Sequence, residues 1–216
     1  MHVSRIYPIF FVAVMAIMAA GCGAPTTALP DPVSNTAANS VTMTYEGHEG
    51  IGPGGYPYYV SINGSSDYTP LMCDSFDNSV ALGETWKATV NPFLTGTGLF
   101  GPTTSLDYRA AGLIFKDMLA GALTSEQAQW AVWGLFSSDA RSRAYFSSID
   151  ASAIESTYLS LAATESNSSY EGLFLYTPIA GTQSSGRRPQ EFMSYSTGEG
   201  SLELTKPVFQ KPVPIL

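Results

Sequence analysis

Alternating apolar and polar residues predict strands in the first half of the chain. At 41–45, Val, Met and Tyr alternate with two threonines, which is typical of a half-buried strand. Further runs rich in aromatic and β-branched residues occupy 56–62, 69–73 and 85–90. Asn63-Gly64, directly after the second run, is a strong hairpin signal. We therefore expect antiparallel strands between residues 41 and 90.

Helical periodicity replaces this alternation after residue 105. Ser105, Thr124 and Asp150 can cap helices over 106–120, 125–137 and 151–163. Strand character returns at 173–176 and 191–195, and weakly at 202–204. Because strands and helices do not alternate regularly, we predict an α+β fold with an antiparallel, β-sandwich-like core and a helical insertion.

The ends of the chain have a different composition. Residues 1–21 have the layout of a secretory signal peptide, in which basic residues precede an apolar run that is shorter than the ~20 residues of a membrane span. Residues 22–40, rich in Pro, Ser, Thr and Ala, are expected to form a flexible tether. A single domain is then expected over 41–205, followed by a Pro-rich tail at 206–216.

Cys22 follows Ala19-Ala20-Gly21, and this segment resembles a bacterial lipobox, with Ala19 where Leu is usual. The resemblance implies that Cys22 is lipidated and anchors the protein to a membrane, because each buried CH₂ adds roughly 0.8 kcal/mol of affinity. The alternative is ordinary cleavage nearby, which would leave Cys22 in a flexible tail or in a disulfide with Cys73. Either interpretation predicts an exported protein, anchored or extracellular.

Charge and residue counts exclude several classes of function. The 216 residues include 18 acidic and 10 basic ones, for a net charge of −8, and loss of Arg5 with the leader makes it −9. Such a chain repels phosphate backbones, so we expect no nucleic-acid partner. His48 is the only histidine outside the leader, which excludes zinc sites built from several His and Cys. We expect no metal and no cofactor.

Gln129 is the most informative residue. Every residue from 128 to 136 is apolar or Gly except Gln129, which indicates a helix buried on all sides. A carboxamide buried there without partners would cost about 1–3 kcal/mol, so it must be hydrogen-bonded or chemically consumed. Gln127 has a simpler explanation as the third residue of a capping box begun by Thr124. Cys73, at the end of a predicted strand, is a candidate for reaction with Gln129, although free cysteines are often inert apolar side chains.

Several motifs together resemble bacterial thioester domains. Residues 129–133 (QWAVW) match the Q-x-A-[I/V]-W part of the family motif, with Ala128 where Thr is commonest. Residues 72–75 (MCDS) and 83–88 (GETWKA) are similar to a related secreted group with a Phe-Cys-Asp-Asp signature, often found with PEP-CTERM sorting tails; Met72 and Ser75 replace the Phe and the second Asp. The resemblance covers roughly residues 41–136.

This resemblance implies cofactor-free chemistry. The sulfur of Cys73 would attack the carboxamide of Gln129, release ammonia and leave an internal thioester that acylates an amine or hydroxyl on a target. Trp130, Trp133 and Trp86 would slow its hydrolysis by excluding water. The implied protein is a surface adhesin that reacts once with a surface protein or polysaccharide and is not a turnover enzyme.

Other interpretations remain open. The chain could be a non-covalent module of the cell envelope with an inert Cys73, or, with less support, a hydrolase that uses His48. The acidic loop residues are too irregularly spaced for a Ca²⁺ loop, and a solvated loop is the simpler explanation for Asp67, Asp74, Asp77 and Asn78. Residues 56–59 could form a sugar-binding platform, although strand aromatics are more often divided between core and surface.

Overall fold

A computed structural model describes residues 40–49 and 56–196. The predicted leader, Cys22, the strand at 202–204 and the tail lie outside the described residues, as does the predicted tether except Ser40, which begins the first strand.

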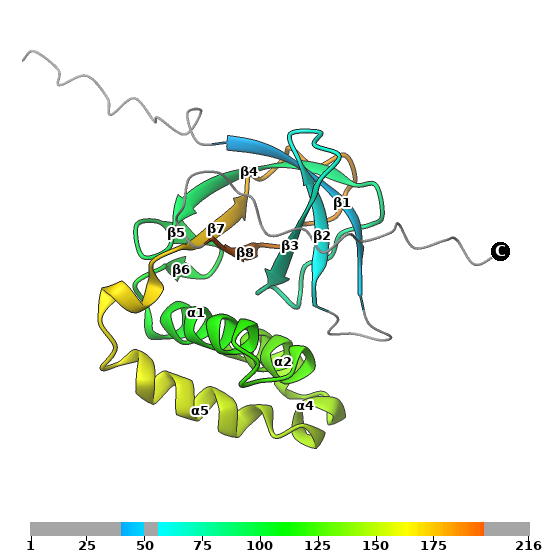
Figure 1. The fold of residues 1–216 in the computed structure, drawn as a ribbon. Coiled ribbons are helices and arrows are strands. Elements are labelled where there is room, and N and C mark those ends of the chain that lie inside the picture. Colours follow the sequence, from blue (N-terminus) through cyan, green and yellow to red (C-terminus); the bar gives the residue numbers. More distant parts are fainter. Residues whose placement is uncertain (1–39, 50–55, 197–216) are drawn as a thin grey trace, which may run out of the picture. The chain divides into compact units, whose positions relative to one another are not determined.

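Six antiparallel strands close into a barrel in the order β1-β2-β3-β8-β7-β4 (Figure 1). The strands are β1 (Ser40–His48), β2 (Tyr58–Ile62), β3 (Tyr68–Cys73), β4 (Thr85–Pro92), β7 (Leu173–Pro178) and β8 (Phe192–Tyr195). A separate two-residue hairpin joins β5 (Thr97–Gly98) to β6 (Gly101–Pro102). The mixed helix-and-strand fold with an antiparallel sheet is therefore confirmed.

The sheet differs from the expected sandwich because it has no open edge. β4 pairs with β1 through Val41↔Ala88 and with β7 through Val90↔Tyr176. β4 therefore joins the first strand of the chain to β7 and closes the sheet. Closure of this kind satisfies the backbone groups that a sandwich would leave at its edges. The turn at Asn63-Gly64 occurs as predicted, with φ of 54° and 73°, and connects β2 to β3.

Helices fill the chain between β6 and β7. They are α1 (Leu106–Leu119), α2 (Ser125–Phe136), α3 (Ser138–Arg141), α4 (Ala144–Ser148), α5 (Ala151–Ala162) and the 3₁₀ turn η2 (Asn167–Tyr170). The insertion lies between β4 and β7, which are neighbours in the barrel. In Figure 1, α1 and α2 lie between the barrel and α5, so α2 is covered on both sides.

The predicted helix caps are partly confirmed. The side chain of Ser105 accepts from the amide of Tyr108, and Thr124 and Gln127 form both bonds of the capping box. Asp150 is the N-cap residue of α5, as predicted, but its backbone is left-handed, with φ 56°, and its side chain makes no capping bond. The short α3, α4 and η2 were not predicted, since segments of four or five residues carry too little periodicity.

Aromatic side chains pack the interior of the barrel. Phe192 on β8 contacts Tyr58 and Trp86, with ring centroids 5.6 Å and 6.1 Å away, and Tyr58 contacts Tyr45 at 6.1 Å. Phe192 is also the strand partner of Cys73. Cys73 therefore ends β3 beside this aromatic core.

The described helices include none that is both long and apolar enough to cross a membrane.

Candidate functional site

Cys73 and Gln129 meet where the end of the barrel contacts α2. Cys73 is the last residue of β3, Gln129 lies in the second turn of α2, and both are 0% exposed. The side-chain nitrogen of Gln129 donates a hydrogen bond to the backbone carbonyl of Cys73 at 2.5 Å. Because a carbonyl can only accept, the amide nitrogen, not the amide oxygen, must face it. The two residues singled out by the sequence are thus in direct contact.

The other end of the Gln129 amide lacks a partner. Its oxygen Oε1 is buried and has no hydrogen bond among the described residues. The expectation that a partner must satisfy Gln129 is met for the nitrogen only, and the unsatisfied oxygen costs about 1–3 kcal/mol. A thioester carbonyl is a weaker acceptor than an amide carbonyl, so conversion to a thioester would lower the cost of burying this oxygen.

The Cys73 thiol is held in a mostly apolar environment. It is a free, buried cysteine, and its sulfur lies 3.6 Å from the carbonyl oxygen of Ser75. Burial raises the pKa of the Cys73 thiol to about 12, and the charge of Asp74 adds to the rise. The indole N–H of Trp133 and the polar groups of Ser75 lower that pKa by smaller amounts. At neutral pH the thiol is therefore protonated and needs a base to become a nucleophile.

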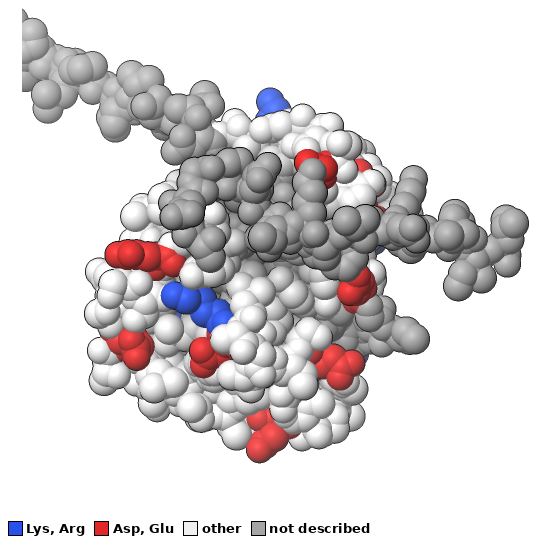
Figure 2. All heavy atoms as spheres, viewed as in Figure 1, with Lys and Arg blue, Asp and Glu red and all other residues white. Residues whose placement is uncertain are grey.

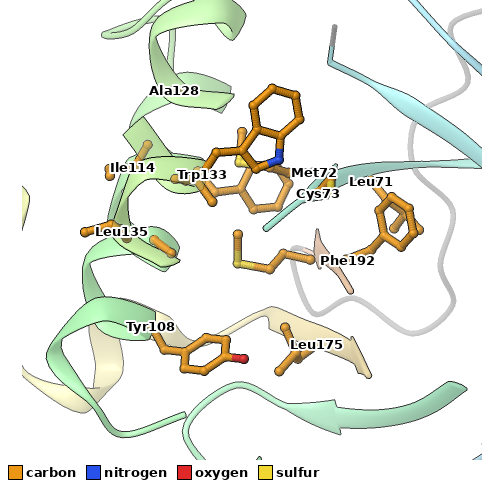
Figure 3. Close-up of a cluster of buried hydrophobic side chains, with 14 of the residues drawn as sticks. Leu71, Met72, Cys73, Tyr108, Ile114, Ala128, Trp133, Leu135, Leu175 and Phe192 are labelled. Atoms are coloured by element: carbon orange, nitrogen blue, oxygen red, sulfur yellow. The ribbon is translucent and has the colours of Figure 1, made fainter. Parts of the chain in front are cut away.

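The three tryptophans are placed differently around this pair. Trp133 directs its indole nitrogen toward the end of β3, beside Met72 and Cys73, and that nitrogen has no oxygen acceptor in the described part of the chain (Figure 3). Trp130 packs edge-to-face on Trp133, with ring centroids 5.3 Å apart. Trp86 lies in the barrel and stacks on Phe192, which is the strand partner of Cys73. Of the three tryptophans, Trp133 is therefore the one that acts on the Cys73 thiol.

Ser75 ties the segment after β3 to the segment before β8. Its hydroxyl accepts from the amide of Glu191 at 2.8 Å, and its carbonyl accepts from the side chain of Gln190 at 3.2 Å. The amide of Asp74 in turn donates to the backbone carbonyl of Glu191 at 3.2 Å. These bonds fix residues 73–75 against residues 190–191.

Two buried carboxyl groups, Asp74 and Glu191, lie beside the pair, and sequence reasoning missed their association. Both are 0% exposed. Glu191 accepts from the hydroxyl of Tyr108 at 2.5 Å and from the amide of Leu99 at 3.0 Å, whereas neither carboxyl oxygen of Asp74 has a donor within the described residues. Burial, and then the charge and hydrogen bonding of Glu191, raise the pKa of Asp74 well above its ordinary value.

Space for the Glu191 carboxyl depends on Gly98 in the β5–β6 hairpin. A Cβ on Gly98 would lie 2.0 Å from the Tyr108 hydroxyl and 2.8 Å from Glu191 Oε1. The glycine thus lets the hairpin backbone approach closely enough for Leu99 to bond Glu191. Asp74 could have been singled out as the one acidic residue next to Cys73, but Glu191 and Tyr108 are 117 and 34 residues away from it and carry no sequence signal.

The other candidate motifs are dispersed. His48 is exposed and bonds the hydroxyl of Tyr45 at 2.7 Å. Asp77 accepts from Ser137, and the described residues contain no group of three or more His, Cys, Asp or Glu side chains that could hold a metal. The tyrosines at 56–59 divide between core and surface, since Tyr58 packs on Phe192 while Tyr59 donates to Glu49.

Acidic side chains are scattered over the face of the domain shown in Figure 2, where basic side chains are few. Among the described residues the one ion pair joins Arg141 to Glu155 at 3.2 Å. Neither carboxyl of the site therefore has a cationic partner there.

No protein-family model matches the chain, and no curated protein or solved structure matches it either.

Proposed function

We propose that this chain forms an internal thioester between Cys73 and Gln129 and uses it to attach covalently to a target surface. The observation that carries the proposal is the direct hydrogen bond between these two fully buried residues. The resemblance of the sequence motifs around them to bacterial thioester domains also supports the proposal. The reaction occurs once per molecule, so the protein is not a turnover enzyme.

Two features of the site support the proposal. The Gln129 carboxamide is bonded to the backbone of the thiol-bearing residue, and closeness of this kind lowers the entropic barrier to a reaction between the two side chains. Burial of both residues keeps water away from the stored thioester. The target nucleophile is an amine or hydroxyl of a surface protein or polysaccharide, and it is acylated by Gln129. The proposed location is the cell surface, with Cys22 as the lipid anchor.

The test is capture of a nucleophile. The full chain carrying Cys22→Ser, which prevents lipidation, is incubated with a biotin-linked primary amine, and peptides are sequenced by mass spectrometry. The proposal predicts an amine adduct on Gln129 and a free thiol on Cys73. Matched Cys73→Ala and Gln129→Met variants should remain unlabelled. A parent that is labelled no more than these variants would refute the proposal.

The alternative is a non-covalent envelope module, and one observation favours it. Complete burial, with a thiol pKa raised to about 12, is what an inert structural cysteine shows. In that case Gln129 simply joins α2 to β3 through its bond to the Cys73 carbonyl. The parent would then keep an unmodified thiol and carboxamide, and amine labelling would not occur.

A further inference from the structure

Two buried polar atoms on α2, one acceptor and one donor, lack hydrogen-bond partners. The acceptor is Oε1 of Gln129 and the donor is the indole Nε1–H of Trp133, and neither has a partner among the described residues. Gln129 is 0% exposed and Trp133 is 4% exposed, so bulk water does not replace the missing partners. An unbonded polar atom in the interior destabilises a fold, so the presence of both calls for an explanation.

The side chains of Gln129 and Trp133 both reach Cys73 from α2. The two residues are four apart in this helix, which places them on one face. The side-chain nitrogen of Gln129 is bonded to the Cys73 carbonyl. The indole nitrogen of Trp133 points toward the end of β3 (Figure 3), and its hydrogen bonding lowers the pKa of the Cys73 thiol. The unpartnered donor and the unpartnered acceptor therefore both belong to side chains that lie against Cys73.

Other buried polar atoms do not account for this arrangement. The carboxyl oxygens of Asp74 are also unpartnered, but the hydrogen bonding that acts on this carboxyl comes from Glu191 and from the backbone of Asp74 itself. Trp86 has an unpartnered indole N–H as well, but its ring stacks on Phe192 inside the barrel. Trp133 is thus the indole whose N–H faces the thiol.

We propose that the Nε1–H group of Trp133 stabilises the negative charge on Oε1 of Gln129 while the thioester forms and reacts, an inference that rests on the proposed function. When Sγ of Cys73 bonds to Cδ of Gln129, Oε1 becomes an oxyanion two bonds from the sulfur that this N–H faces, which brings it within reach of the donor. The C–N bond then breaks, the thiol proton passes to the nitrogen, and ammonia leaves. A donor aimed at charge that develops during the reaction lowers its barrier.

The same donor serves the capture step. The nitrogen of a target amine bonds to Cδ of Gln129, Oε1 again carries the negative charge, the C–S bond breaks, and a proton from the amine passes to the sulfur. In the thioester between these two steps, the N–H of Trp133 donates to the carbonyl oxygen. The reaction therefore supplies a partner to each of the two atoms that lack one in the unreacted chain.

The experiment removes the N–H and keeps the shape of the ring. In the Cys22→Ser chain, 3-benzothienylalanine, which has sulfur in place of the indole N–H, is introduced at position 133. An infrared difference spectrum between the thioester and the chain opened by hydroxylamine isolates the thioester carbonyl band. Without the donor, this band should move to higher frequency. Capture of a biotin-linked primary amine, followed by intact mass, should slow by roughly 10²–10³-fold.

The matched control is the same replacement at position 86. Trp86 is 1% exposed and its N–H is also unpartnered, so the change in chemistry and burial is the same at both positions. The position-86 analogue should keep the carbonyl frequency of the parent, and an equal shift in both analogues would overturn the role of Trp133. Thermal unfolding verifies that each analogue is folded.

The outcomes distinguish the two proposals. A folded position-133 analogue with the carbonyl frequency or the capture rate of the parent would overturn the role of Trp133 and leave the thioester intact. A folded position-133 analogue that keeps its ammonia, beside a position-86 analogue that loses it, would support that role. A parent that never loses ammonia would overturn both proposals.

Discussion

The side-chain nitrogen of Gln129 donates a hydrogen bond to the backbone carbonyl of Cys73 at 2.5 Å, across 56 residues of sequence. Two local preferences produce this contact. The Thr124–Gln127 capping box fixes where α2 begins, and the register Cys73↔Phe192 fixes where β3 ends. Gln129 is then the one polar side chain that α2 buries against the end of β3.

Gly134 is expected to be essential for the packing of α2 against α5. A Cβ at this position would lie 1.8 Å from Glu155 Oε1 and 2.5 Å from Cε2 of Phe146. Gly134→Ala should therefore lower the free energy of unfolding by about 1–3 kcal/mol, although Ala is ordinarily the better helix former. Urea denaturation measures this change.

The control for Gly134 is Gly186, an exposed position where a Cβ would meet no atom within 4 Å. Gly186→Ala should change the free energy of unfolding by no more than about 0.5 kcal/mol. A Gly134→Ala protein at least as stable as the parent would show that the α2–α5 contact is looser than described.

The free Cys73 thiol should react only at high pH. In a Gln129→Met variant, which cannot form the thioester, alkylation of the folded protein should be negligible near pH 8 and should begin only toward pH 12, because burial favours the neutral thiol. The urea-unfolded chain, with an ordinary thiol pKa near 9.0, supplies the comparison. Equal rates for folded and unfolded chains at pH 8 would contradict the burial of this sulfur.

The same shift links the thiol to stability in that variant. The pKa in the folded state is higher than in the unfolded state, so the contribution of the neutral thiol is complete below pH 9.0 and is lost as the pH rises toward about 12. Replacing Cys73 by Ala in the Gln129→Met background should flatten this part of the curve of unfolding free energy against pH. An identical slope in both proteins would contradict the raised pKa of the Cys73 thiol in the folded state.

Trp133 is expected to tune the thiol through its N–H group. Trp133→Phe in the Gln129→Met background keeps an aromatic ring near Phe76 but removes the N–H that lowers the thiol pKa. Alkylation of the folded protein at a fixed alkaline pH should therefore become slower. Trp130→Phe, the same change in volume on the same helix, is the matched control and should leave the rate nearly unchanged.

If Trp133→Phe and Trp130→Phe both accelerate alkylation, and to the same degree, access to the sulfur, and not hydrogen bonding, controls its reactivity. Stopped-flow or mass-spectrometric time courses measure both rates under identical conditions.

Local sequence patterns predicted most elements of the fold. Alternation located the barrel strands, and the capping signals at Ser105 and Thr124 placed the starts of α1 and α2. Closure of the barrel could not be predicted in this way, because the pairing of β4 with β1 and β7 depends on contacts distant in sequence. The hairpin of β5 and β6 was missed because each strand has only two residues.

The residues of the candidate site were likewise predicted only in part. Gln129 was conspicuous because it is polar in an otherwise apolar helix, and Cys73 because it ends a strand and has no evident cysteine partner. Glu191 and Tyr108 were not predicted, since their roles arise from packing of β8 and α1 near the end of β3. The unpartnered carboxyl of Asp74 is visible only once those neighbours are in place.

The most direct test of the central claim is the intact mass of the Cys22→Ser chain beside a Cys22→Ser, Cys73→Ala control, with the processed N-terminus read by fragmentation. The account predicts that the parent is lighter than its sequence mass by one ammonia and that the control has its full sequence mass. A parent of full mass with an unmodified Cys73 thiol would contradict the thioester.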